Sequence, residues 1–389
     1  MVGKTSIQLK IVLFANTDWY LYNFRLSLAN ALRDRGDDLL LLSPPGEYGK
    51  KLVDLGFRWQ PLPMERRSLN PIRELSLVFH LWRLVRKEKP DLVHGFTIKC
   101  AVYGALAARF ARVPGRVSSV AGLGYVFTSS DLKARTLRPL VRALMRFALG
   151  GRNARLILQN SDDVAMFKSA GIVAASQIRL IRGSGFDSER FTPPTKKQSQ
   201  REPTTVLLAA RVLWDKGIRE YVDAARQLRL NRTDIKFLLA GTPDPGNPAA
   251  VPEEEIKAWH EEGIVRWLGH VDDMPTLYQN TDIVVLPSYR EGLPKGLIEA
   301  AACGLALVAT DVPGCREVVT NEVDGLLVPV RDSTALAEAI SRLTDNRELA
   351  RKLGTAAREN ALGNFDERIV IRQTTSVYQE LSPTTQSTE

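Results

Sequence analysis

The feature that most constrains this chain of 389 residues is an alternation of strand-like and helix-like segments that stops near residue 190 and then starts again. In the first series, short apolar segments alternate with helical patterns at 22–35 and 71–87. Parallel strands need a crossover segment, usually a helix, so this order predicts a parallel sheet covered by helices. The expected strands of the first series are 10–15, 38–43, 91–96, 116–120 and 155–159.

A polar segment beginning at Phe191, FTPPTKKQSQREPTT, separates the two series and is typical of a linker or exposed loop. We therefore predict an N-terminal domain at 1–190 and a second domain at 191–365. Residues 366–389 are expected to form a helix that returns toward the first domain, followed by a polar tail. The expected strands of the second series are 205–210, 235–240, 264–268, 283–287, 305–310 and 325–328, and its helices are 217–228, 252–262, 294–303 and 333–361.

The predicted fold class is therefore α/β, with two Rossmann-like halves. Ligands of such sheets bind outside the carboxyl ends of the strands, and two facing domains would hold a substrate in the cleft between them. The sequence has no GxGxxG after its first strand and no Walker pattern, which argues against dinucleotide and ATP enzymes. It also lacks an Asp-x-Asp motif for a divalent cation, so no metal site is predicted.

Charge is unevenly spread along the chain. Residues 1–190 hold 30 Lys and Arg against 15 Asp and Glu, whereas residues 191–389 hold 23 against 29. A basic half favours a polyanionic partner, although it can also serve solubility alone. Basic and aromatic residues do not interleave as they do on single-stranded nucleic-acid platforms, so nucleic acid is not expected. The polyanionic partner is therefore expected to be an anionic membrane surface or a phosphorylated substrate.

One basic helix is expected at 137–150. Its arginines recur every four residues on one face, and its large apolar residues lie on the other, an arrangement that suits either a membrane interface or packing on the core. No apolar run reaches membrane-spanning length, no signal peptide is evident, and three scattered cysteines favour a reducing compartment. We therefore expect a cytoplasmic protein, peripheral on the inner face of the cell membrane. The arginines are Arg138, Arg142 and Arg146, and the apolar residues are Leu137, Leu140, Val141, Leu144 and Phe147.

Two motifs follow strands of the second series. Arg211 ends the first strand and Lys216 follows it, and together these cations could neutralise a diphosphate without a metal. The run EGLPKGLIE, from Glu291 to Glu299, resembles a turn that opens a helix, where backbone amides face an anion. Its two carboxylates could bind sugar hydroxyls, or they could simply be solvated. His94 ends a strand of the first series and could stabilise a developing charge, unless it is a packed core histidine.

These residues together resemble glycosyltransferase family 4, the retaining GT-B enzymes. The resemblance rests on Arg211 and Lys216, on the two acids Glu291 and Glu299 with seven residues between them, on PSYREGLPKGLIEAAACGLALVATDVPGCREVV, and on DGLLVPV. It implies two facing domains and a metal-independent hexosyltransferase with no cofactor besides its nucleotide-sugar substrate. By position, Arg211 and Lys216 would hold the donor diphosphate and Glu299 the ribose. Glu291 and the loop residues Gly292, Leu293, Pro294 and Lys295 would hold the transferred sugar. The loop from Trp267 to His270 would lie alongside the base of the nucleotide. His94 would lie near the reacting sugar.

The first half is similar to bacterial enzymes that extend polyprenyl-diphosphate-linked sugars, above all N-acetylgalactosaminyl and related aminosugar transferases. The similar stretches are LYNFRLSLANAL, RRSLNP and SVAGLGYVF, whereas Asn16 to Tyr20 replaces a common Gly-Gly loop. The resemblance implies a UDP-sugar donor, an N-acetylhexosamine as the transferred group, and cell-surface glycan assembly. The expected acceptor-diphosphate residues are Arg25, Arg66, Arg67 and Lys99.

Other classes remain open at this point. A nucleotide-sugar epimerase, a sugar phosphorylase or a GT-B enzyme with a soluble acceptor could share the two-domain pattern. An epimerase would convert the donor alone, and a phosphorylase would absorb light through pyridoxal phosphate. A non-catalytic protein that binds anionic lipid would fit the basic half, but it would give Glu291 and Glu299 no purpose.

Overall fold

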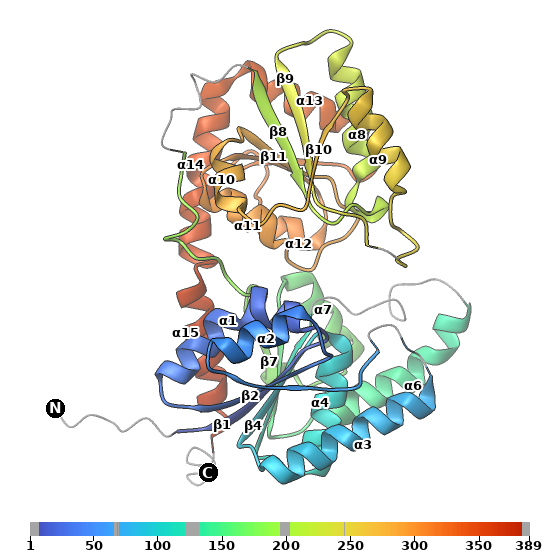
Figure 1. Ribbon diagram of the computed structural model, residues 1–389, viewed down its shortest axis with the longest axis vertical. Helices are drawn as coiled ribbons and strands as arrows, with labels where there is room; N and C mark the ends of the chain where they lie inside the picture. Colours follow the sequence, from blue (N-terminus) through green and yellow to red (C-terminus); the bar gives the residue numbers. More distant parts are fainter. Residues whose placement is uncertain are drawn as a thin grey trace, which may run out of the picture. The chain divides into compact units, whose positions relative to one another are not determined.

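The structure, a computed structural model, describes residues 8–65, 68, 70–120, 132–194, 203–244 and 246–382, and only the backbone of 132–138 and 140. The chain forms two compact units (Figure 1). Unit 1 consists of Met1–Ser184 and Val370–Glu389, and unit 2 of Gly185–Ile369. In the described part of the chain, no helix combines the length and the hydrophobicity needed to cross a bilayer.

Unit 1 is built on a seven-stranded parallel sheet with the order β3-β2-β1-β4-β5-β6-β7. The central strands are almost fully buried, as expected for a parallel sheet with both faces covered. The order reverses between β1 and β4, so ligands are expected beyond the carboxyl ends of these two strands. The strands are β1 (Lys10–Phe14), β2 (Asp38–Ser43), β3 (Arg58–Pro61), β4 (Leu92–Phe96), β5 (Gly115–Val120), β6 (Ala154–Leu158) and β7 (Ile178–Leu180).

Helices cover both faces of this sheet (Figure 1). One face packs against α1 (Asp18–Asp34), α2 (Glu47–Asp54) and the C-terminal helix α15 (Glu367–Gln379), whose Tyr378 is fully buried in that core. The other face packs against α3 (Pro71–Glu88), α4 (Ile98–Phe110), α6 (Leu132–Leu149) and α7 (Ser161–Ala170). Of these, α4 contacts both α3 and α6.

Unit 2 repeats the design with a six-stranded parallel sheet of order β10-β9-β8-β11-β12-β13, which reverses between β8 and β11. Together the units confirm the predicted pair of parallel α/β folds. The strands are β8 (Thr204–Ala209), β9 (Ile235–Ala240), β10 (Arg266–Gly269), β11 (Ile283–Leu286), β12 (Ala306–Thr310) and β13 (Leu326–Val328). The helices are α8 (Ile218–Arg229), α9 (Glu253–Glu261), α10 (Met274–Gln279), α11 (Lys295–Ala302), α12 (Pro313–Arg316), α13 (Ser333–Asp345) and α14 (Arg347–Asn364).

The helix expected at 333–361 is wrong as a single element. The structure ends α13 at Asp345 and begins α14 at Arg347, with Asn346 between them. The Asn346 side chain accepts a hydrogen bond from the Leu349 amide at 2.9 Å, which is a typical N-cap. The helical spacing of apolar residues continues across this break, so the sequence pattern alone did not reveal it.

The predicted apolar face of the basic helix is also wrong in part. Of the α6 side chains that the structure describes, Met145, Ala148 and Leu149 are buried, whereas Leu144 and Phe147 are each 44% exposed. The side chains of Leu137, Arg138 and Leu140 lie outside the described part of the chain, and Arg142 and Arg146 are exposed. Within its described part, the helix therefore leaves both cations and large apolar groups on its outer surface.

Candidate active site

The two charged motifs of unit 2 meet where its strand order reverses. Arg211 and Lys216 follow β8, and the run from Glu291 to Glu299 follows β11. Because β8 and β11 are parallel neighbours, their carboxyl ends lie at the same edge of the sheet. This is the position at which open α/β sheets bind ligands.

Lys216 and Glu291 form the centre of the site. The Lys216 Nζ lies 2.5 Å from Glu291 Oε1, and both side chains are largely buried. The Ser288 hydroxyl donates to the same carboxylate oxygen at 2.7 Å. The sequence predicted separate substrate contacts for Lys216 and Glu291, whereas the structure joins the two side chains in one ion pair. The hydrogen bond from Ser288 to this pair was not predicted.

Two close backbone contacts fix this pair. Gly217, directly after Lys216, has φ +71°, and a Cβ there would lie 2.1 Å from the Pro287 carbonyl oxygen. A Cβ on Gly314 of α12 would lie 2.7 Å from the Glu291 carbonyl oxygen. Only glycine allows these approaches, and the Tyr289 amide donates to the Asp215 carbonyl oxygen at 2.9 Å, which joins the loops after β8 and β11.

Arg211 reaches the same edge of the sheet but points elsewhere. Its Nη1 donates to Asp244 Oδ2 at 2.9 Å, and its side chain is about half exposed. Asp244 lies beyond β9, so the loops after β8 and β9 are joined by this pair. To bind a phosphate, the guanidinium would use its other donors or leave Asp244.

Glu299 lies one turn inside α11. Burial raises the pKa of its carboxyl, and the positive charges of Lys295 and Arg190 oppose that shift. The Lys295 Nζ is 3.7 Å from Glu299 Oε1. Arg190 was not predicted; it directly precedes the polar segment that begins at Phe191. Helix α11 begins after its N-cap Pro294, and the positive end of its dipole lies at this edge of the sheet.

The predicted base-binding residues lie on β10, at Trp267, and directly after it, at His270. The Trp267 indole donates to the Gly241 carbonyl oxygen at 2.8 Å, which fixes the ring against the end of β9. The Gly241 amide donates to the Gly269 carbonyl oxygen at 2.7 Å. His270 is exposed, with Nε2 3.1 Å from Asp272. Contact of Trp267 and His270 with a base stays a prediction.

His94 of unit 1 is enclosed by other side chains of the same unit. It is fully buried in the middle of β4, with Nδ1 2.6 Å from the Tyr378 hydroxyl and Nε2 2.7 Å from the Ser119 hydroxyl. Burial, with a smaller effect of the nearby Arg25, lowers its pKa well below the usual range, so the ring is neutral. Both ring nitrogens have protein partners, and a catalytic role for His94 stays a prediction.

The predicted acceptor residues have diverse surroundings. Arg25 is only 5% exposed, with its guanidinium 4.4 Å from the centre of the Phe96 ring and a hydrogen bond to the Tyr20 hydroxyl. Lys99 donates to Glu74 at 2.9 Å and to two backbone carbonyls. Neither cation is free as placed. Arg66, Arg67 and the stretch Ala121 to Phe127 lie outside the described residues.

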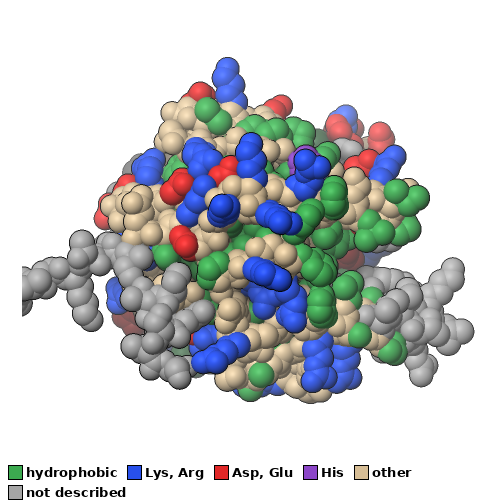
Figure 2. Space-filling model, turned by 90° about the horizontal axis from the view of Figure 1, so that it is seen from below, with side chains coloured by type: hydrophobic (Ala, Val, Ile, Leu, Met, Phe, Trp, Pro, Cys, Tyr) green, Lys and Arg blue, Asp and Glu red, His purple; other side chains and the backbone are tan. Residues whose placement is uncertain are grey.

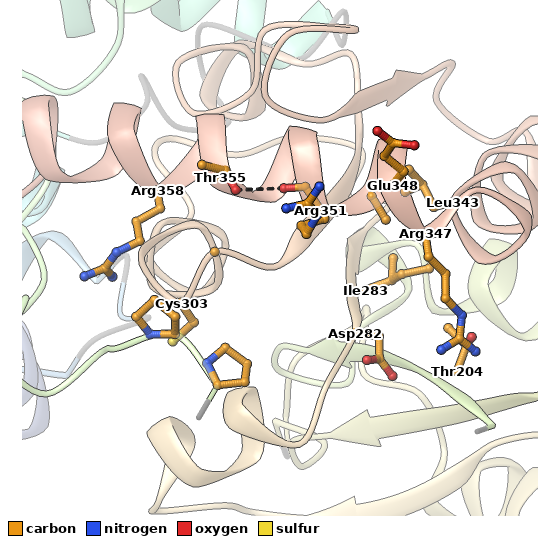
Figure 3. Close-up of a pocket in the computed structure, with 14 residues that line it drawn as sticks. Thr204, Asp282, Ile283, Cys303, Leu343, Arg347, Glu348, Arg351, Thr355 and Arg358 are labelled. Atoms are coloured by element: carbon orange, nitrogen blue, oxygen red, sulfur yellow. Dashed lines mark hydrogen bonds between the residues drawn. The ribbon is translucent and has the colours of Figure 1, made fainter. Parts of the chain in front are cut away.

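A cavity of about 730 Å³ in unit 2 is distinct from this site (Figure 3). It is lined by the beginnings of β8 and β11, at Thr204 and Ile283, and by Arg351 and Arg358 of α14. It therefore lies at the amino ends of the strands, whereas Lys216 and Glu291 follow their carboxyl ends.

Comparisons with known proteins identify relatives of both halves of the chain. Residues 190–360 match the family model of glycosyl transferases group 1, and residues 10–161 match that of glycosyl transferase 4-like proteins. The chain is 31% identical to the N,N'-diacetylbacillosaminyl-diphospho-undecaprenol alpha-1,3-N-acetylgalactosaminyltransferase of Campylobacter jejuni, over 92% of this chain and 95% of that one. It is 27% identical to the UDP-Gal:alpha-D-GlcNAc-diphosphoundecaprenol alpha-1,3-galactosyltransferase of Escherichia coli, over 74% and 75% of the two chains.

Solved structures agree on the fold. A glycosyltransferase from Rickettsia africae has a TM-score of 0.78 at 18% identity and covers 96% of this chain and 99% of its own. HepE from Anabaena, solved in complex with UDP, has a TM-score of 0.77 at 21% identity and covers 96% and 100%. The resemblance to glycosyltransferase family 4 is thus confirmed: the chain belongs to the group 1 glycosyl transferases and has their GT-B fold.

Proposed function

We propose that this enzyme transfers a hexose, most simply an N-acetylhexosamine, from a UDP-sugar to a sugar linked to polyprenyl diphosphate. The observation that carries the proposal is the Lys216–Glu291 pair at the ligand-binding edge of unit 2, with Glu299 on the helix that follows Glu291 in the chain. The proposed substrates are supported by the names of the two relatives, both of which specify a diphospho-undecaprenol acceptor.

The donor diphosphate would leave from this edge. The Lys216 ammonium has three N–H donors and gives one to Glu291, so it can donate to a phosphate oxygen while it stays paired. The first turn of α11 adds backbone donors and a favourable dipole for an anion. These groups can neutralise the leaving diphosphate, so we propose that turnover needs no metal ion.

We further propose retention of anomeric configuration. The names of both relatives specify an alpha linkage in the product. A UDP-hexose donor carries its sugar in the alpha configuration, so an alpha product requires retention. We place the reaction at the cytoplasmic face of the membrane, where a nucleotide sugar and a lipid-linked acceptor can meet.

The two glutamates are expected to have separable roles. Glu299→Ala should weaken UDP binding roughly 10–100-fold, because a hydrogen bond to a charged group contributes about 1.5–3 kcal/mol. Glu291→Ala should lower turnover and alter sugar preference, with UDP affinity almost unchanged. Calorimetric titration of both variants with UDP, alongside turnover, checks this. Equal losses of UDP affinity would show that one carboxylate is assigned to the wrong part of the donor.

Acid pH provides a second readout on Glu299. Since its pKa is raised, the carboxylate takes up a proton at a higher pH than an ordinary glutamate. UDP affinity should therefore begin to fall on acidification before an ordinary glutamate would titrate. Glu299→Gln should remove this early fall while leaving the later pH dependence in place.

A further inference from the structure

Helix α3 has an apolar surface that faces solvent. The side that faces the sheet is buried. On its outer side, Ile72, Leu75 and Phe79 are spaced three and four residues apart and are 76%, 71% and 55% exposed. We call these three residues the outer stripe. Contiguous exposed apolar residues at helical spacing do not serve the unit's own core and mark an interaction surface.

A second exposed group of apolar residues, which we call the α6 cluster, lies on the same helical layer of unit 1. Leu144 and Phe147 of α6 are each 44% exposed, and Phe110 at the end of α4 is 58% exposed. The Phe110 and Phe147 rings lie 6.1 Å apart, and the Arg109 guanidinium stands 4.4 Å from the centre of the Phe147 ring. Because α4 contacts both α3 and α6, the cluster and the outer stripe belong to one side of the sheet.

Cations surround these apolar groups. Arg83 and Arg86 continue the outer side of α3, and Arg142 and Arg146 are exposed on α6. The 18 residues of α6 include no acid, and both acids of α3 are in ion pairs, Glu74 with Lys99 and Glu88 with Lys10. Figure 2, which views the molecule from below, shows Lys and Arg side chains gathered on that face with hydrophobic side chains among them.

We propose that the outer stripe and the α6 cluster insert into the interface of an anionic lipid bilayer, with the surrounding arginines on lipid phosphates. Exposed apolar side chains rimmed by Lys and Arg are the composition of interfacial helices. A second copy of this chain is a poor occupant, because its equally cationic face would repel the first. The inference rests on the proposed function, whose lipid-linked acceptor requires the enzyme to work at a membrane.

Sedimentation with vesicles of phosphatidylcholine, with and without phosphatidylglycerol, tests this surface. Leu75→Glu with Phe79→Glu should weaken binding to anionic vesicles roughly 30-fold or more at both low and high salt, because insertion of apolar groups is not screened. Arg142→Glu with Arg146→Glu should weaken it roughly tenfold at low salt and little at high salt. Leu230→Glu is the matched control, since Leu230 of unit 2 is 82% exposed but lies outside this surface.

UDP titration of every variant controls for folding, and the vesicles contain no acceptor, so this test does not depend on transfer. Absence of vesicle binding by the unmodified protein would overturn the inference and leave the transfer reaction untouched. An equal loss for Leu230→Glu would overturn it as well. So would sedimentation velocity showing that the outer-stripe variant turns a dimer into a monomer, because the surface would then bind a second copy.

Discussion

Lys216→Ala is expected to lower turnover about 10²–10³-fold, the usual effect of removing one preorganised donor from a developing negative charge. The reason is geometric: the ammonium is held by Glu291 at the end of β8, so it is already in place when the diphosphate leaves. Thermal unfolding of the variant should remain close to that of the unmodified protein. Initial rates at saturating donor and acceptor measure the effect.

Lys257→Ala is the matched control for this variant. Lys257 is an exposed lysine on α9, paired with Glu253 at 2.9 Å, and should leave the rate unchanged. Near-normal turnover in Lys216→Ala would remove this lysine from the leaving-group site. Arg211→Ala is expected to fall in the same range only if its guanidinium binds the diphosphate.

Gly241→Ala should have the largest effect on stability among changes near the site. Gly241 has φ +136°, and a Cβ there would lie 1.9 Å from the Ala210 carbonyl oxygen. The loops after β8 and β9 would have to separate, which displaces Arg211 and the carbonyl that accepts from Trp267. Backbone strain and overpacking together predict a loss of about 3 kcal/mol.

Gly269→Ala separates backbone strain from lack of space. Gly269 also has a left-handed φ of +67°, but nothing lies within 4 Å of a Cβ built on it. It should therefore lose only about 1 kcal/mol from the left-handed backbone alone. Urea unfolding of both variants compares them, and equal losses would show that the approach of Gly241 to Ala210 does not limit this loop.

The sequence predicted the central strands of both sheets because they are continuous apolar runs. It missed the edge strands β3 and β7, which are short and partly exposed, so their residues lack that signal. It also placed both charged motifs at strand ends, and the parallel pairing of β8 with β11 brought them together. The side-chain pairing of Lys216 with Glu291 could not be predicted, because it depends on loop backbones fixed by Gly217 and Gly314.

His94 shows where strand-end reasoning fails. The sequence predicted that His94 ends its strand, whereas it is the middle residue of β4, and Tyr378, 284 residues later, covers it from the C-terminal helix. No local pattern around His94 contains that contact. The prediction for the basic helix was wrong for a related reason. The elements that pack against α6, rather than the spacing of its own apolar residues, decide that Met145 is buried and Phe147 is not.

The most direct test of the account is transfer of radiolabelled N-acetylhexosamine from its UDP form to a polyprenyl-diphosphate-linked amino sugar, measured in the lipid extract with excess EDTA present. The account predicts a labelled lipid one sugar longer, undiminished by EDTA and reduced about 10²–10³-fold by Lys216→Ala. A requirement for added magnesium would contradict the proposed role of the protein's cations. The absence of any labelled lipid across UDP-hexoses and lipid-linked acceptors, or equal transfer to a soluble sugar, would contradict the central claim.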